Sequence, residues 1–289
     1  MNYRHGFHAG NHADVLKHLV LVSLLDALKK KDAPFFVVDT HAGRGRYDLA
    51  GLQASRTGEA KAGIRKLWAL AAAMPTPPPA LARYLAAVAA AQAGAPDSYP
   101  GSPLIVSQAL RPQDRLAACE LLPDEANVLK GVLSHDPHSH VHTRDGYAAL
   151  KALLPPRDGP TKFARALVLI DPPYEAQDEE YPLITNAVAD ALLRFPQGIF
   201  AIWYPIKQRP SLHPFFRKVA TLPVKSALAI ELLVRPDDSP LRMNGSGMLL
   251  LNPPWQIEKD IEPALKPLAQ SMGEAGASWR LTWLKQDKA

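Results

Sequence analysis

The stretch LVLIDPPYE, residues 167–175, ends a run of four aliphatic residues on an acid, two prolines and an aromatic residue. Short aliphatic runs of this kind are typical of strands that are buried on both faces of a parallel sheet. Pro172 and Pro173 lack a backbone N–H and restrict φ, so the strand has to end at Asp171. The sequence therefore predicts a rigid strand end, at which the Asp171 carboxylate and the Pro172 carbonyl present two acceptors beside the ring of Tyr174.

Strand-like and helix-like segments alternate through the rest of the chain. Apolar residues at helical spacing predict a helix over residues 12–30. Strands are predicted over residues 34–39, 115–120, 140–145, 166–171, 199–204, 226–234, 246–252 and 279–284. This order predicts an α/β fold with a mostly parallel central sheet that is covered by helices on both faces, and ligands bind such sheets beyond the carboxyl ends of the strands.

The segment 48–100 differs in composition from its surroundings. It is rich in alanine, is split by MPTPPP (74–79), and has prolines and glycines at its margins. Proline and glycine interrupt regular structure, so we expect an inserted helical subdomain with helices over roughly 59–73 and 80–93. Residues 1–47 would then form an N-terminal cap and the first part of the main domain, and residues 101–289 would form its remainder.

Composition narrows the functional classes. Lys and Arg number 33 against 28 Asp and Glu, which gives a net charge of +5 and favours a polyanionic partner without requiring one. The single cysteine, Cys119, allows no internal disulfide. The start of the chain has no signal-peptide pattern, and no apolar run reaches the roughly 18 residues of a membrane span. We therefore expect a soluble cytoplasmic protein, a monomer, without membrane contact.

Acids stand at three of the predicted strand ends, Glu120, Asp145 and Asp171, at intervals of 25 and 26 residues. Because the carboxyl ends of parallel strands meet at one edge of a sheet, these acids should lie together. Glu120 can be interpreted as an acceptor for a ribose diol or as a surface glutamate. Asp145 with Gly146 could accept from an adenine amine or form a turn, and its register with the other acids favours the ligand.

The first predicted strand is followed by DTHAGRGR, residues 39–46. Gly43 and Gly45 would let the backbone approach a ligand closely, although a tight turn needs the same residues.

At the end of the strand 166–171, the two acceptors and the ring of Tyr174 suit a planar base with an exocyclic amine. The acceptors would take the two amine hydrogens and direct the nitrogen lone pair at an electrophile, while the ring stacks on the base.

DPPY after a strand, downstream of a glycine loop, is similar to the amino-methyltransferases that act on adenine N6 or cytosine N4 with S-adenosylmethionine. A narrower resemblance rests on six segments in a fixed order. They are YRHGFHAGNHADVLKH (3–18), VDTHAGRGRYDL (38–49), GSP (101–103), RDGY (144–147), DPPYE (171–175) and WYPIK (203–207). Together they resemble the bacterial 23S ribosomal RNA adenine-N6 methyltransferase family over essentially the whole chain.

This resemblance implies a Rossmann-like methyltransferase fold, S-adenosylmethionine as the donor and an adenine of 23S rRNA as the acceptor. It implies that Asp171, Pro172 and Tyr174 form the catalytic group, and that Tyr3 and His5 close over the cofactor and the target base. The implied cofactor-binding residues are His18, His41, Gly43, Ser102, Glu120, Asp145, Gly146 and Asp171.

Several alternatives stay open at this point. A DNA adenine-N6 or cytosine-N4 methyltransferase would need a target-recognition domain, a dinucleotide-dependent oxidoreductase would leave DPPY unused, and a non-catalytic RNA-binding module would tolerate loss of Asp171. The segment NPPW (252–255) also fits the amino-methyltransferase pattern, but it follows a predicted hairpin strand, so we interpret it as a turn. Histidines at 138, 140 and 142 could share one strand face, but we expect no metal because methyl transfer from a sulfonium needs none.

Overall fold

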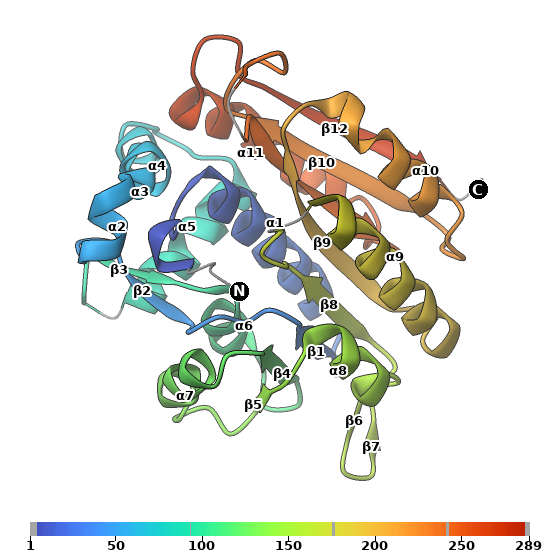
Figure 1. The fold of residues 1–289 in the computed structure, drawn as a ribbon. Helices are drawn as coiled ribbons and strands as arrows, with labels where there is room; N and C mark the ends of the chain where they lie inside the picture. The colour runs from blue at the N-terminus through green and yellow to red at the C-terminus, as the bar shows by residue number, and fades with distance from the viewer. Residues whose placement is uncertain (1–4, 93, 175–176, 241–242, 287–289) are drawn as a thin grey trace.

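The computed structural model describes residues 5–92, 94–174, 177–240 and 243–286, and within them eight strands form one central sheet (Figure 1). The strands lie in the order β12-β10-β11-β9-β8-β1-β4-β5. They are β1 (Phe36–Asp39), β4 (Arg115–Glu120), β5 (Ser139–Thr143), β8 (Ala166–Ile170), β9 (Ile199–Ile206), β10 (Ala227–Leu233), β11 (Gly245–Leu251) and β12 (Ser278–Lys285). The five from β9 to β5 are parallel, and β11, β10 and β12 extend the sheet by antiparallel pairing, which confirms the predicted α/β fold.

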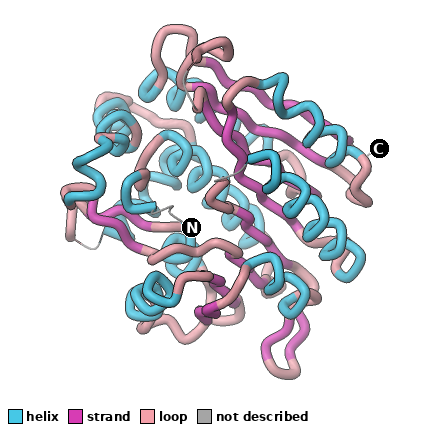
Figure 2. Tube along the Cα trace, viewed as in Figure 1, coloured by secondary structure: helices cyan, strands magenta, loops and turns pink. Residues whose placement is uncertain are grey.

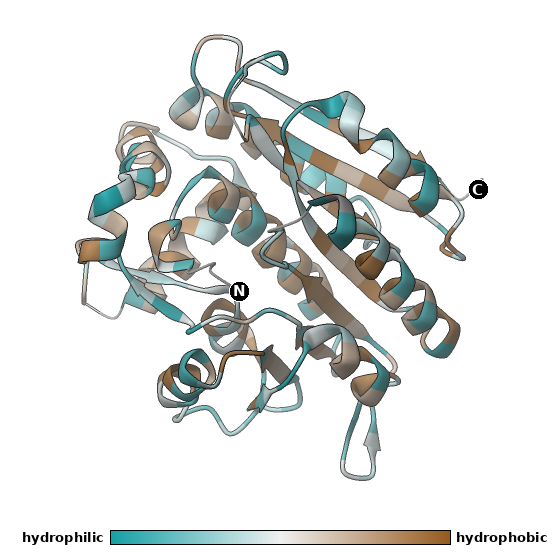
Figure 3. Cartoon of the chain, in the orientation of Figure 1, coloured by the Kyte–Doolittle hydropathy of each residue, from teal (hydrophilic) through white to brown (hydrophobic). Residues whose placement is uncertain are grey.

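Helices cover both faces of this sheet because its central strands are apolar on both sides. Val37 packs into one core cluster and its neighbour Val38 into the other, as do Leu167 and Val168 on β8. One cluster contains α1 (His12–Lys29), α6 (Ser102–Ala109) and α11 (Ile257–Met272). The other contains α8 (Gly146–Leu153), α9 (Gln177–Arg194) and α10 (His213–Ala220). Figure 3 shows the central strands as largely hydrophobic and the helices as mixed in polarity.

Helix α1 begins at the predicted residue because Asn11 caps it. The Asn11 side chain accepts hydrogen bonds from the backbone N–H groups of Ala13 and Asp14, which have no partner inside the helix. The helix is buried along most of its length and includes three buried polar residues in its first turns, Asp14, Lys17 and His18. These side chains need polar partners: Lys17 finds one in Asp171 at the carboxyl edge of the sheet, and His18 finds one in Tyr99.

The segment after β1 forms a helical lobe closed by a two-stranded ribbon, visible on the left of Figure 2. Its elements are β2 (Arg46–Asp48), α2 (Leu52–Thr57), α3 (Glu59–Ala62), α4 (Ile64–Ala72), α5 (Pro79–Gln92) and β3 (Ser98–Pro100). The predicted helix over 59–73 is interrupted at Gly63, where a Cβ would lie 2.2 Å from the carbonyl oxygen of Gly10. Buried residues of α4 and α5 share one core cluster with α1, so the lobe packs directly on the main body.

The remaining elements connect the layers. They are η1 (His5–Phe7), α7 (Pro123–Val132), the hairpin of β6 (Arg157–Asp158) and β7 (Thr161–Lys162), and η2 (Arg209–Leu212). None of the helices in the described part of the chain is both long enough and apolar enough to span a membrane.

The segment NPPW lies at the edge of the sheet opposite to DPPY. Leu251, the last residue of β11, pairs with Phe200 at the start of β9, so Asn252 stands at the amino ends of the parallel strands. The Asn252 side chain donates to the carbonyls of Pro196 and Gly198 and accepts from the backbone N–H of Lys225. Asn252 also has a φ of +49°, which asparagine tolerates better than most residues. These contacts support its interpretation as a structural turn.

We predict that Asn252→Ala lowers the free energy of unfolding by about 1–3 kcal/mol, because it removes three side-chain hydrogen bonds and leaves alanine at positive φ. Urea unfolding measures this change. Asn252→Gly is the matched control: it loses the same hydrogen bonds but accepts the backbone conformation, so it should be destabilised less than the alanine variant. Equal stability of the alanine variant and the wild type would contradict the structural role.

Candidate active site

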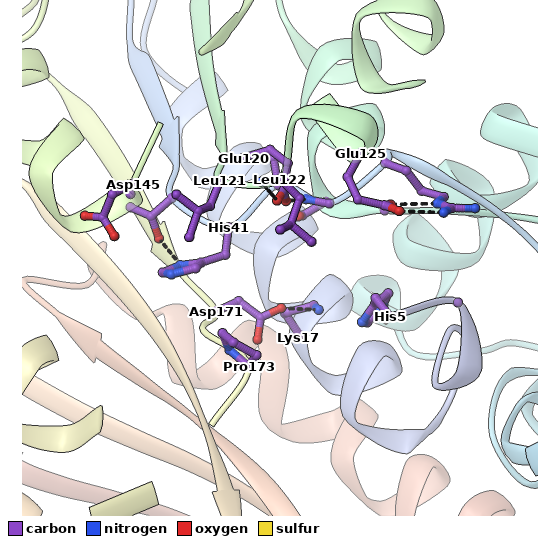
Figure 4. Close-up of a pocket in the computed structure, with 18 of the residues that line it drawn as sticks. His5, Lys17, His41, Glu120, Leu121, Leu122, Glu125, Asp145, Asp171 and Pro173 are labelled. Atoms are coloured by element: carbon purple, nitrogen blue, oxygen red, sulfur yellow. Dashed lines mark hydrogen bonds and ion pairs between the residues drawn. The ribbon is translucent and has the colours of Figure 1, made fainter. Parts of the chain in front are cut away.

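A cavity of about 730 Å³ opens at the carboxyl edge of the sheet, within the range of small-molecule and cofactor sites. Figure 4 shows Lys17 against Asp171, with Glu120 and Asp145 across the cavity from them. The structure brings together all residues that the sequence predicts to bind the cofactor: His18, His41, Gly43, Ser102, Glu120, Asp145, Gly146 and Asp171 all line this cavity.

A second cavity of about 230 Å³ adjoins the first. The two share four lining residues, His5, Lys17, Asp171 and Pro173. Pro172, Tyr174, Trp203, Lys207 and Met243 line only the smaller one. The smaller cavity lies below the usual volume of a cofactor site, so it suits one ring system better than a whole nucleotide. The predicted catalytic segment thus forms the wall between two adjoining spaces.

Asp171 is held by a buried lysine on α1. Lys17 Nζ donates to Asp171 Oδ2 at 2.5 Å and to Asp14 Oδ1 at 2.8 Å. Burial opposes the charge of Lys17, but the two carboxylates outweigh it and hold the lysine pKa well above its usual value. His5 Nε2 lies 3.0 Å from Asp14 Oδ2, and the backbone N–H of Gly10 donates to the same oxygen. Lys17 therefore stays charged and occupies one of the two Asp171 oxygens.

The backbone of the DPPY segment turns sharply at Tyr174, whose φ is +36°. The Tyr174 hydroxyl donates to the backbone carbonyl of Trp203 at 2.7 Å, and its ring meets the rings of Trp203 and Tyr181 edge to face. These contacts from β9 and α9 hold an unfavourable backbone conformation in place. The ring of Tyr174 is consequently fixed in the wall of the smaller cavity.

The glycine loop closes over the end of β4. Glu120 Oε2 accepts from the backbone N–H of Gly43 at 2.9 Å, and Oε1 accepts from that of Leu122 at 2.8 Å. Each carboxylate oxygen has a second lone pair, so Glu120 can still accept from a diol in the cavity. Gly43 has a φ of +61°, and a Cβ there would lie 2.3 Å from the Tyr47 hydroxyl. Arg44 forms a two-pronged ion pair with Glu125, which ties the loop to α7.

Asp145 and Gly146 begin helix α8. One Asp145 oxygen accepts from the backbone N–H of Ala148 and caps the helix. A Cβ at Gly146 would lie 2.1 Å from the carbonyl oxygen of Thr40, so only glycine lets the two loops meet. Asp145 is exposed and lines the cavity, which leaves it accessible to a ligand while it caps the helix.

His41 and His18 line the cavity as neutral imidazoles. Burial lowers the pKa of His41 to about 4 and that of His18 to about 3. Thr40 donates its hydroxyl proton to the carbonyl of Leu169, so His41 Nδ1 donates to the Thr40 oxygen and its Nε2 is left as an acceptor. His18 Nε2 is buried and has no hydrogen-bonding partner among the described residues. A ligand atom that completes this bond would fit the site, which agrees with a bound cofactor.

Three residues that the sequence analysis did not single out shape the site. They are Lys17, Asp39 and Trp203. Lys17 is the easiest to have found, because it lies one helical turn after Asp14 on the buried side of the predicted helix. Asp39 is fully buried at the end of β1 and accepts from the Ser102 hydroxyl at 2.6 Å.

The sequence also singles out Tyr3 and the histidines at 138, 140 and 142. Tyr3, predicted to close over the cofactor, lies outside the described residues. The described residues contain no group of three or more His, Cys, Asp and Glu side chains placed to hold a metal ion. Among the histidines at 138, 140 and 142, His138 Nδ1 lies 3.1 Å from Arg115 Nη1.

Asp39 makes stability depend on pH. Burial raises its pKa from 3.8 to about 7, so the folded state keeps a proton that the unfolded chain releases near pH 4. The free energy of unfolding should therefore decrease as the pH rises from about 4 to about 7, by up to about 1.4 kcal/mol per pH unit. Asp39→Asn keeps an acceptor for Ser102 and removes this titration. Urea unfolding across that range should show a flatter profile for the variant, and parallel profiles would refute the assignment.

Comparison with known proteins agrees with this geometry. Residues 32–285 match the family model described as "Ribosomal RNA large subunit methyltransferase D, RlmJ". Proteins named "Ribosomal RNA large subunit methyltransferase J" are 40% identical in Haemophilus influenzae, over 98% of this chain and 99% of the relative, and 39% identical in Escherichia coli, over 96% and 98%. A crystal structure from Legionella pneumophila has a TM-score of 0.85 at 33% identity and covers 97% of this chain and 99% of its own. The chain therefore belongs to the RlmJ family of ribosomal RNA large subunit methyltransferases.

Proposed function

We propose that this protein transfers the methyl group of S-adenosylmethionine to the exocyclic N6 amine of an adenine in 23S ribosomal RNA. Family membership supports the reaction class and the RNA substrate. The observation that supports the amine as acceptor is the DPPY wall: Asp171 and Pro173 face both the large cavity and the small one. A donor in the first space and a base in the second would meet at this wall.

The large cavity would hold the cofactor, which supplies an electrophilic methyl group. Glu120 would accept from the ribose hydroxyls, and Asp145 with Gly146 would contact the adenine ring. His18 and Ser102 would contact the amino-acid part, and His41, whose ring meets that of Tyr147 edge to face, would line the cavity beside Gly146. This orientation puts the reactive end of the cofactor near Asp171, whose carboxylate forms part of the same wall.

The small cavity would hold the target base. Lys17 occupies Asp171 Oδ2, so Oδ1 is the oxygen left to accept one amine hydrogen. No described residue donates to the Pro172 carbonyl, which can take the other hydrogen. Tyr174 would offer the face of its fixed ring to the base. Two acceptors on one amine favour a tetrahedral nitrogen and direct its lone pair toward the methyl group.

Asp171 acts through geometry more than basicity in this proposal. Lys17 already occupies one of its oxygens, and the amine becomes acidic only once it is alkylated. The surplus proton then passes to water.

The volume of the small cavity admits a base only after it has left its stack, so an unpaired adenine of the rRNA is the preferred acceptor. We also propose that the enzyme acts in the cytoplasm as a monomer.

Asp171→Ala should lower methyl transfer by at least about 100-fold, because the amine loses its main acceptor and Lys17 loses a counter-charge. Transfer of labelled methyl to unmodified 23S rRNA measures the effect, and calorimetry with S-adenosylhomocysteine shows whether the cofactor still binds, as we expect. Asn252→Ala, in the other Pro-Pro-aromatic segment, is the control and should keep wild-type activity per folded molecule. Full activity of Asp171→Ala would rule out the assignment.

The acceptor is tested by offering the enzyme unmodified 23S rRNA, assembled large subunits and duplex DNA, followed by nucleoside mass analysis. We expect N6-methyladenosine from the RNA substrates only. Label confined to DNA would favour the DNA methyltransferase alternative, and a methylated cytosine would show that the small cavity selects a different base. If the wild-type protein methylated none of these substrates but still bound RNA, it would be a non-catalytic RNA-binding module.

A further inference from the structure

A chain of three hydrogen-bonding side chains runs from the inserted helical lobe to the large cavity. Tyr84 on α5, Tyr99 on β3 and His18 on α1 are each at most 1% exposed. Tyr84 Oη lies 3.0 Å from Tyr99 Oη, which in turn lies 3.0 Å from His18 Nδ1. Two of these three residues come from the segment between β1 and α6, so the lobe reaches the site through buried hydroxyl groups.

The protons of this chain can be arranged in two directions. In the first, Tyr84 donates to Tyr99, Tyr99 donates to His18 Nδ1, and the imidazole proton is on Nε2, which has no partner among the described residues. In the second, His18 Nδ1 donates to Tyr99, Tyr99 donates to Tyr84, and the Tyr84 proton has no acceptor among the described residues. Each direction leaves one buried donor without a partner among the described residues, the Nε2–H of His18 in the first and the hydroxyl of Tyr84 in the second. His18 lines the large cavity, whereas Tyr84 is fully buried in the core, so an acceptor from the cavity can complete only the first arrangement, which is therefore favoured.

The ionisation states of the three groups agree with this direction. Burial lowers the pKa of His18 to about 3, so the ring is neutral at physiological pH and has one proton to place. Burial likewise raises the pKa of both tyrosines, which keep their protons. With Nδ1 accepting from Tyr99, the single imidazole proton is on Nε2, the nitrogen that has no partner within the described structure.

We propose that Tyr99, supported by Tyr84, is a positioning residue that holds His18 in the tautomer with its proton on Nε2, so that this N–H donates to the carboxylate of the cofactor. The identity of that ligand rests on the proposed function, whereas the tautomer itself does not. The carboxylate is the matching group because the nucleoside end would contact Glu120 and Asp145, which leaves the amino-acid end for His18. Tyr84 and Tyr99 would thus contribute to cofactor binding although neither is among the residues that line the cavity.

Nitrogen NMR of histidine-labelled protein tests the tautomer directly, because the ¹⁵N shift of each ring nitrogen reports whether it is protonated. The His18 signals are assigned by their loss in His18→Gln. In the free wild-type protein we expect a protonated Nε2 and an unprotonated Nδ1. A proton on Nδ1 would overturn the proposal regardless of any activity measurement.

Two matched variants separate tautomer control from the loss of a buried hydroxyl. Tyr99→Phe removes the donor to Nδ1 and should produce a measurable fraction of the Nδ1-protonated tautomer. Tyr84→Phe removes an equally buried hydroxyl one step further away, and Tyr99 can still donate to His18, so the Nε2 tautomer should persist. Identical His18 spectra in wild type and Tyr99→Phe would contradict the role of Tyr99.

Calorimetry with S-adenosylhomocysteine then tests the consequence for the ligand. Only molecules in the donor tautomer bind well, so Tyr99→Phe should weaken binding by about threefold or more while Tyr84→Phe stays close to wild type. Equal binding by Tyr99→Phe and wild type, with a shifted tautomer, would overturn the assignment of the carboxylate to His18. Failure of the wild type to bind this probe would instead count against the proposed function and leave the NMR result to decide the tautomer.

Discussion

The ion pair between Lys17 and Asp171 is the contact on which the arrangement of the site depends. It joins the first long helix to a strand end 154 residues later, and it does so in the interior, where Lys17 is almost fully buried. Placing an ammonium there is unfavourable unless carboxylates surround it, and Asp14 and Asp171 supply that environment. Removal of one partner of such a buried pair typically lowers the free energy of unfolding by about 3–5 kcal/mol. The pair therefore constrains where α1 can lie against the sheet.

This constraint also explains why the two cavities meet where they do. Once α1 is held against the end of β8, His18, one residue after Lys17, lines the large cavity, and His5, bound to Asp14, lines both. The proline pair stops β8 so that its last carboxylate stands between the cavities instead of continuing the sheet. The inserted lobe completes the arrangement, because its buried Tyr84 and Tyr99 share a core cluster with α1 and Tyr99 contacts His18.

Much of the fold could be predicted from the sequence because it depends on local patterns. The aliphatic runs before Asp39, Glu120 and Asp171 identify strands, and the regular spacing of Glu120, Asp145 and Asp171 predicts that these three acids lie at one edge of the sheet. The helix from His12 was predicted to within one residue, since Asn11 and the apolar spacing are both local signals. The β2–β3 ribbon and the break at Gly63 were not predicted, because they depend on contacts with Pro100 and Gly10 that are distant in sequence.

The sequence by itself determined the chemistry of the strand end: an acid, a free carbonyl and an aromatic ring follow β8, and the prolines forbid any continuation. It could not separate DPPY from NPPW on composition, since both satisfy one pattern. The order of the predicted strands favoured DPPY, and the tertiary structure supplies the physical reason, because strand direction places Asp171 at the carboxyl edge and Asn252 at the amino edge. Burial likewise decided the roles of Lys17, Asp39 and the tyrosine chain to His18, because the charge and protonation of these groups depend on neighbours that only folding brings together.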